Sequence, residues 1–321
     1  MAVILLPGGG DDSADGDLKI VCTFLPVYVF ALNVVGDAPG VRVELLIAPE
    51  TGCPHSYSLR AGDLARIAEA DIIVANGLGI EAFLDEAVRQ HARGRVITIS
   101  DDCDVLSRGS VGAGHEYDEE GHEEHAEHGA ASRPHHAHGD VNPHVWVSPA
   151  QAIRQVSRLA EHLAEADPPR AEAYRHNAEA YVNRLGLLLK DMRDAARSFG
   201  NRNIVTFHDA FDYLARDLGL NVVASLTVDP EEAMSARQMA RVIETIKETK
   251  AAAIFCEPAY SDAAAHTVAQ DVGVPVFTLN PFNTIDAEPT AESYEQVMRQ
   301  NLQVLREALG AAHDGGGQDG K

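Results

Sequence analysis

The fold of this chain is decided by residues 169–199, which read PRAEAYRHNAEAYVNRLGLLLKDMRDAARSF. Apolar side chains recur in this stretch at alternating spacings of four and three, the pattern of one helix with a single buried stripe. They are Tyr174, Ala178, Tyr181, Leu185, Leu188, Met192, Ala195 and Phe199. Roughly thirty residues at ~1.5 Å rise each span about 45 Å, which is longer than one small domain. We therefore expect a rigid helix that packs against two separate units.

Short apolar strands alternate with amphipathic helices on both sides of this helix. The expected strands are 19–24, 41–47, 71–75 and 95–99 before it, and 203–207, 221–224, 252–256 and 274–279 after it. Such alternation is typical of a parallel sheet covered by helices on both faces. The sequence therefore predicts an α/β protein of two lobes, each a parallel sheet flanked by helices, joined by one long rigid helix. The predicted divisions are a signal remnant or flexible tail (1–17), an N-terminal lobe (18–168), the linking helix (169–199), a C-terminal lobe (200–310) and a disordered tail (311–321).

The composition limits the partners of the protein. Of 321 residues, 49 are acidic and 26 basic, so the formal net charge is -23. A surface this negative repels nucleic acid and attracts cations, which excludes nucleic-acid binding. No stretch approaches the ~20 apolar residues of a membrane span, and we interpret the apolar start, residues 1–7, as the remnant of a secretory signal. The four cysteines form disulfides or are small core residues, and the sequence leaves both open; they are Cys22, Cys53, Cys103 and Cys256.

Residues 115–138 break the strand–helix alternation. Seven of the 15 histidines lie here among many carboxylates: His115, His122, His125, His128, His135, His136 and His138. The stretch has almost no apolar side chains to bury, which predicts a disordered loop. Imidazoles and carboxylates on such a loop bind divalent metals loosely, so we expect a secondary, low-affinity metal site. The alternative is a solvated low-complexity loop without metal.

Three further histidines lie at comparable places in the predicted fold. His55 follows the second strand, His144 comes just after the His-rich segment, and His208 directly follows the strand that ends at Phe207. In parallel α/β sheets, ligands bind at the carboxyl ends of the strands. The sequence therefore predicts that the three imidazoles meet in the cleft between the lobes. Each of them alone would more often be an ordinary polar loop residue.

The sequence motifs around these histidines and along the rest of the chain are specific to one family of proteins. The relevant motifs are Gly52-Cys-Pro-His-Ser-Tyr-Ser58, Ala70-Asp-Ile-Ile-Val-Ala-Asn-Gly-Leu-Gly-Ile-Glu81, Asn142-Pro-His-Val-Trp-Val-Ser-Pro149, Phe207-His-Asp-Ala-Phe-Asp-Tyr-Leu214 and Tyr294-Glu-Gln-Val-Met-Arg-Gln-Asn-Leu302. Over about residues 18–309 the chain resembles the substrate-binding proteins of zinc and manganese ABC importers, and its His-rich loop resembles the zinc-specific branch. The resemblance implies two α/β lobes bridged by a long helix, with a metal held by His55, His144 and His208.

The fourth ligand is where the sequence departs from the family. The resemblance implies an aspartate, but the matching position here is Asn280, whose amide oxygen is a poor zinc ligand. Asp286 lies six residues further on in the same predicted loop, and we predict that it supplies the fourth ligand. Water in a vacant position is the other alternative. Three nitrogen ligands favour Zn²⁺, whereas oxygen-rich sites suit Mn²⁺.

The resemblance implies a function in metal transport. We expect a monomeric, non-enzymatic, periplasmic protein, soluble or lipid-anchored, that delivers Zn²⁺ to the membrane permease of an ABC importer. A periplasmic zinc-donating protein is a second expected partner. One alternative is a manganese or iron carrier of the same fold. The other is a zinc hydrolase, which would need a general base such as Glu257 or Asp209 and for which the chain has no HExxH motif.

Overall fold

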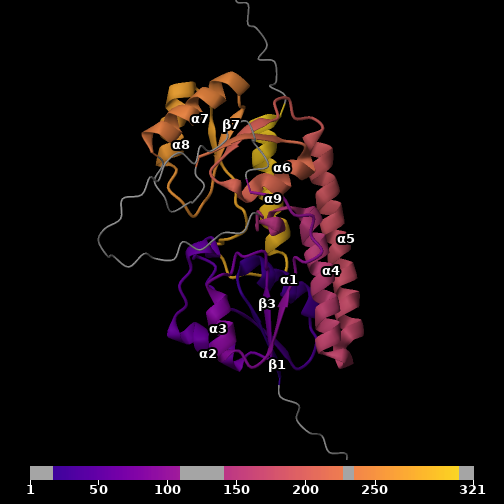
Figure 1. Cartoon of the computed structure of the whole chain (residues 1–321). Helices are drawn as coiled ribbons and strands as arrows, with labels where there is room; N and C mark the ends of the chain where they lie inside the picture. Colours follow the sequence, from indigo (N-terminus) through magenta and orange to yellow (C-terminus); the bar gives the residue numbers. More distant parts are fainter. Residues whose placement is uncertain (1–16, 109–140, 227–234, 311–321) are drawn as a thin grey trace, which may run out of the picture.

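Two four-stranded parallel sheets form the centres of two lobes, one above the other in Figure 1. The computed structural model describes residues 17–108, 141–226 and 235–310. Both sheets have the same topology, with strand orders β2-β1-β3-β4 and β6-β5-β7-β8. The strands are β1 (Leu18–Cys22), β2 (Val41–Leu45), β3 (Ile72–Ala75), β4 (Arg95–Thr98), β5 (Asn203–Thr206), β6 (Asn221–Ser225), β7 (Ala253–Cys256) and β8 (Val276–Thr278).

Helices cover the sheets and connect the lobes. The α-helices are α1 (Leu25–Val35), α2 (Ala61–Glu69), α3 (Leu84–His91), α4 (Pro149–Ala166), α5 (Ala171–Ala196), α6 (Asp212–Leu218), α7 (Ala236–Thr249), α8 (Ala263–Val272) and α9 (Ser293–Leu309). Short 3₁₀ helices lie at η1 (Pro54–Ser56), η2 (Val145–Val147), η3 (Pro168–Arg170) and η4 (Asp209–Phe211).

The strands have the burial that parallel sheets between helical layers require. All four residues of β3 are buried, and so are all four of β7. Central strands with apolar residues on both faces need helices on both sides, which the alternating helices provide. The predicted fold class, two such lobes joined by a long helix, is therefore confirmed.

The long helix α5 spans both lobes (Figure 1). Its 26 residues at ~1.5 Å rise give about 39 Å. The predicted stripe is buried, with Tyr174 and Tyr181 fully enclosed, whereas Leu187 on the other side is 63% exposed. Near the start of α5, Tyr174 Oη donates a 2.6 Å hydrogen bond to Asp167 Oδ2, which ties the helix to the turn before it.

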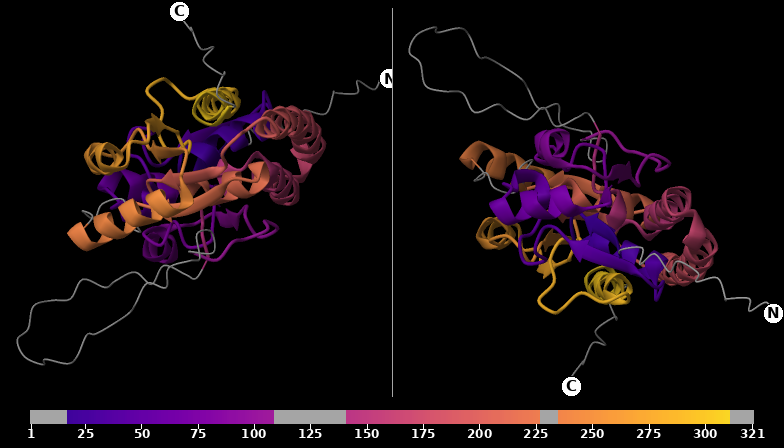
Figure 2. Two further views of the ribbon diagram at one scale, coloured as in Figure 1. Left: turned by 90° about the horizontal axis from the view of Figure 1, so that it is seen from above. Right: turned by 90° about the horizontal axis from the view of Figure 1, so that it is seen from below.

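A second long helix, α4, was not among the sequence expectations. It begins with Pro149 at its first position, and Ser148 Oγ caps it by accepting a 3.1 Å hydrogen bond from the Gln151 amide. The turn at η3 reverses the chain, so α4 packs antiparallel against α5, and Figure 2 shows the pair side by side at one edge of the molecule. Two antiparallel helices, α4 and α5, therefore form the connection between the lobes.

The lobes also share one aromatic core. Trp146 in η2 packs edge-on against Phe24 with ring centroids 4.9 Å apart, and donates a 2.7 Å hydrogen bond to the Pro281 carbonyl. Tyr294 in α9 donates to the Trp146 carbonyl at 2.8 Å and contacts Phe30 of α1. These contacts join residues 122 or more positions apart, and they make large hinge movements between the lobes costly.

All four cysteines are free thiols, and three of them are buried. Within the described ranges, no helix combines the length and apolarity that crossing a bilayer requires. The predicted flexible tails, apart from residue 17, and the predicted disordered loop at 115–138 lie outside the residues that the structure describes.

Candidate metal centre

His55 lies in η1, in the long loop that follows β2. This loop approaches the other lobe closely at Gly52, which has a φ of +86°, and a Cβ there would lie 3.3 Å from the Ala259 Cβ. A glycine allows both the left-handed backbone and the close approach. The loop thereby carries Cys53 and His55 to the boundary between the lobes.

His144 is almost fully buried, with 1% of its surface exposed. Asn142 fixes the ring, because its Oδ1 accepts from the His144 amide at 3.0 Å and lies 2.8 Å from His144 Nδ1. Asp209 Oδ1 lies 3.5 Å from the same Nδ1. Nε2 is therefore the nitrogen left for a metal. Burial, together with neighbouring His208 and His55, lowers the pKa of His144 well below its usual value, which keeps this imidazole neutral.

His208 follows β5, and Glu257 follows the neighbouring strand β7. Because both strands end at the same edge of the sheet, the two side chains meet, and Glu257 Oε1 contacts His208 Nδ1. Burial opposes protonation of His208, but the Glu257 carboxylate outweighs it and raises the pKa of His208. Such a carboxylate orients an imidazole so that its Nε2 can face a metal. The sequence alone indicates Glu257 only as the general base that a zinc hydrolase would need.

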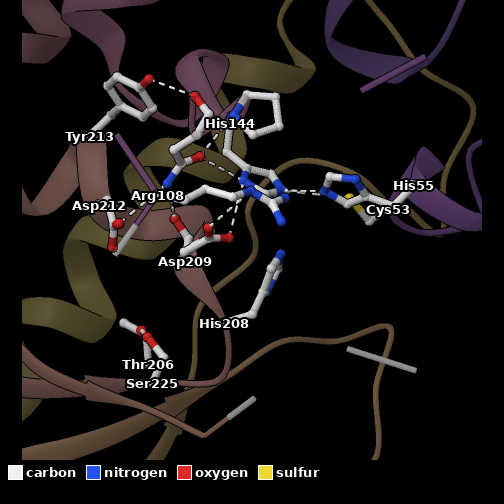
Figure 3. A network of polar contacts seen from close by, with 12 residues as sticks. Cys53, His55, Arg108, His144, Thr206, His208, Asp209, Asp212, Tyr213 and Ser225 are labelled. Atoms are coloured by element: carbon white, nitrogen blue, oxygen red, sulfur yellow. Dashed lines mark hydrogen bonds and ion pairs between the residues drawn. The ribbon is translucent and has the colours of Figure 1, made fainter. Parts of the chain in front are cut away.

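The three predicted histidines lie together, as Figure 3 shows. His55 Nε2 and His144 Nε2 are 3.1 Å apart, and the rings of His144 and His208 have centroids 4.9 Å apart. Two nitrogens on one tetrahedral Zn²⁺, at bond lengths of ~2.0–2.1 Å, would be about 3.3 Å apart. The separation of His55 from His144 fits a shared ion.

Cys53 is a further neighbour that the sequence analysis did not include among the site residues. Its Sγ lies 3.7 Å from His144 Nε2, and the possible ligand atoms of Cys53, His144 and His208 all lie within 4.8 Å of one another. Burial raises the pKa of the Cys53 thiol. The sequence signal was its position two residues before His55, on the same loop.

The predicted fourth ligand lies in the loop after β8. Asp286 is exposed, while the preceding Ile285 donates a 3.4 Å backbone hydrogen bond to Pro49, so this loop borders the loop that carries His55. Asn280, the other candidate, uses its Oδ1 to accept from the Phe282 amide at 2.8 Å. That bond occupies the oxygen through which Asn280 would bind a metal. Asp286 is not part of the group that Cys53, His144 and His208 form among the described residues, and His55, which contacts His144, is not part of it either.

The predicted secondary site falls outside the described residues. It comprises His115, His122, His125, His128, His135, His136 and His138. The described chain stops at Arg108 and resumes at Val141, and Ser107 pairs with Val141 in an isolated antiparallel bridge. Ser107 and Val141, on either side of the residues that are not described, are therefore held together, and Val141 lies three residues before His144.

Buried imidazoles from both lobes around one point form a typical binding site for a borderline divalent cation. A closed set of protein ligands traps such an ion, whereas catalysis needs an open position with a general base beside it. The described site has its carboxylates on the far side of the imidazoles, at the Nδ1 atoms.

Comparisons with known proteins find relatives over most of the chain. The zinc-binding lipoprotein AdcA of Streptococcus pneumoniae is 35% identical over 308 residues, which are 95% of this chain and 58% of the relative. The high-affinity zinc uptake system protein ZnuA of Bacillus subtilis is 31% identical over 305 residues, 94% of this chain and 90% of the relative. The Zn(II)-bound structure of S. pneumoniae AdcA superposes with a TM-score of 0.71 at 30% identity, covering 92% of this chain and 59% of that one.

The chain thus spans less than two thirds of the length of AdcA, but nearly all of the Bacillus protein. The family model of the zinc-uptake complex component A, a periplasmic transport component, matches residues 20–308. With a match over most of its length and relatives above 30% identity, the chain belongs to this ZnuA family.

Proposed function

We propose that the protein binds one Zn²⁺ between its lobes through His55, His144 and His208, and delivers it outside the cytoplasm to the permease of an ABC importer. The observation that carries the proposal is the meeting of imidazoles from two lobes: His55 Nε2 lies 3.1 Å from His144 Nε2, and the His144 and His208 rings are in contact. The family assignment supports the role in uptake. The relatives AdcA and ZnuA are named as zinc-binding and zinc-uptake proteins.

The polar groups around the site favour binding over hydrolysis. Glu257 has no exposed side-chain surface and is engaged by His208. Asp209 lies between His144 and Arg108, 3.8 Å from Arg108 Nε. A general base must reach a metal-bound water, and these carboxylates contact the opposite side of the imidazoles. We therefore propose that the protein is not an enzyme.

The test is zinc content and zinc affinity of His55→Ala, His144→Ala and His208→Ala. Each substitution removes one nitrogen ligand and should abolish tight binding, measured by competition with a chromophoric chelator. His266→Ala is the matched control, because His266 is 55% exposed on α8 and pairs with Asp262. Full zinc affinity in all three site variants would refute the proposal.

The metal itself is tested by competition. With Zn²⁺ and Mn²⁺ at equal free concentrations, three imidazoles should retain zinc, since nitrogen ligands prefer it to manganese. Preferential retention of manganese would favour the alternative hypothesis, a manganese or iron carrier of the same fold. Asp286, the fourth ligand predicted from the sequence, is tested with Asp286→Asn: weaker zinc binding would support that prediction, and unchanged affinity would remove Asp286 from the ligand set.

The importer is tested by transport. Vesicles that contain the cognate permease and ATPase should take up zinc only when the zinc-loaded protein is supplied outside, and His144→Ala should not support uptake. Equal uptake with free zinc alone would contradict a role in delivery.

A further inference from the structure

Cys53 is placed as a ligand would be. It is 6% exposed, and its Sγ faces the same point as His144 Nε2 and the His208 ring. Figure 3 shows the Cys53 sulfur and the His55 ring together on one side of His144, both from the η1 loop. The loop conformation that delivers His55 to the site therefore delivers this thiol as well.

The distances match a mixed nitrogen and sulfur site. With Zn–N bonds of ~2.0–2.1 Å and a Zn–S bond of ~2.3 Å, tetrahedral geometry separates a nitrogen from the sulfur by about 3.6 Å. Cys53 Sγ and His144 Nε2 are 3.7 Å apart. The corresponding nitrogen pair is expected at about 3.3 Å, and His55 Nε2 lies 3.1 Å from His144 Nε2. Cys53 Sγ therefore lies further from His144 Nε2 than His55 Nε2 does, as the longer Zn–S bond requires.

A second observation points to a ligand at this place. His208 Nε2 is buried and has no hydrogen-bond partner among the described residues. Its ring is 1% exposed, is held from behind by Glu257, and directs Nε2 toward His144 in Figure 3. Leaving a buried nitrogen unpaired is costly, so the site is built for a group that binds there.

Charge favours a thiolate as well. Zn²⁺ with three neutral imidazoles would carry two positive charges into a buried site, and burying unpaired charge is expensive. A Cys53 thiolate supplies one negative charge and the buried Glu257 carboxylate the other. The metal, its ligands and Glu257 would then be neutral together. Exposed Asp286 offers no such compensation without moving.

We propose that Cys53 is the fourth ligand, so that the ion is held by three imidazole nitrogens and one thiolate sulfur in a closed tetrahedral site. This rests on the proposed zinc-binding function. The S–H bond breaks as the Zn–S bond forms, and the proton leaves to solvent. A sulfur ligand makes the site selective for thiophilic cations such as Zn²⁺, Co²⁺ and Cd²⁺ and disfavours Mn²⁺.

Cobalt is the probe that reports sulfur directly. The purified wild-type chain is titrated with Co²⁺ alone, and a sulfur-to-cobalt charge-transfer band in the near-ultraviolet is expected at one equivalent, together with the visible bands of tetrahedral cobalt. Cys53→Ser should remove the charge-transfer band and weaken zinc affinity at least about tenfold, since even changes to groups behind the ligands cost that much.

Cys103→Ser is the matched control, because Cys103 is a partly buried thiol that contacts the Gln151 carbonyl in the first lobe. It should leave the band unchanged, as should Asp286→Asn. If wild-type protein binds cobalt tightly without a sulfur band, Cys53 is not a ligand while the zinc-binding function stands. If the band persists in Cys53→Ser, the sulfur comes from elsewhere, and the proposal is refuted. Absence of tight binding of either metal would instead refute the proposed function.

Discussion

Replacing Glu257 with glutamine tests how the buried carboxylate controls the metal centre. Glu257 has no exposed side-chain surface, and its Oε1 contacts His208 Nδ1. Glutamine has nearly the same shape and still accepts from Nδ1, so the change removes charge and little else. Loss of a carboxylate behind a metal-binding histidine typically costs 10–100-fold in affinity, which corresponds to about 1.4–2.8 kcal/mol.

The pH dependence of this loss has a predicted sign. In the wild type the carboxylate raises the pKa of His208. Protons therefore begin to compete with zinc for the His208 imidazole at a higher pH than they would without the carboxylate. Glutamine removes that effect and lowers the pKa of His208. The affinity ratio between wild type and Glu257→Gln should therefore be largest at alkaline pH and shrink as the pH falls.

The assay is competition for zinc with a chromophoric chelator at several pH values. The control is Glu161→Gln, an exposed residue of α4 that pairs with Arg175, and it should leave zinc affinity unchanged. Equal affinity of wild type and Glu257→Gln at every pH, or a ratio that grows with acidity, would refute the reasoning.

Three further predictions concern stability and metal loading. Burial and then the neighbouring Asp209 charge raise the pKa of Asp212 from 3.8 to about 7, so the metal-free protein should lose up to about 4 kcal/mol of stability as pH rises between these values. In denaturant titrations Asp212→Asn should flatten that dependence, and an unchanged slope would contradict it. Trp146→Phe removes the indole donor to Pro281 and should cost about 2–4 kcal/mol in the free energy of unfolding; a loss below about 1 kcal/mol would show that the contact between lobes matters little. Deletion of 115–138 should leave tight zinc affinity unchanged and slow loading from dilute zinc, which stopped-flow measurements check; abolished tight binding would assign primary ligands to that segment.

Much of the fold could be predicted because its signals are local. Short, continuous apolar runs such as Ile72–Ala75 are typical of buried strands between helices, and the periodicity of 169–199 is independent of the rest of the chain. The helix α4 was missed although its start has an ordinary signal, Ser148 followed by Pro149. It lies directly before the predicted linking helix, and the sequence analysis assigned no element to these residues.

The site was predictable only in part. The places of His55 and His208 follow from where strands end, since topology alone brings those ends together. The position of Cys53 depends on a left-handed glycine and on how closely the two lobes approach, which no local pattern specifies. The role of Glu257 depends likewise on the pairing of β5 with β7. Contacts across chain distances of this kind are set by tertiary packing.

The most direct test of the central claim is anomalous diffraction at the zinc edge from crystals of the zinc-loaded protein. The account predicts one strong peak between the lobes, ~2.0–2.1 Å from the Nε2 atoms of His55, His144 and His208. A peak elsewhere, or one that leaves any of these three imidazoles unbound, would contradict it.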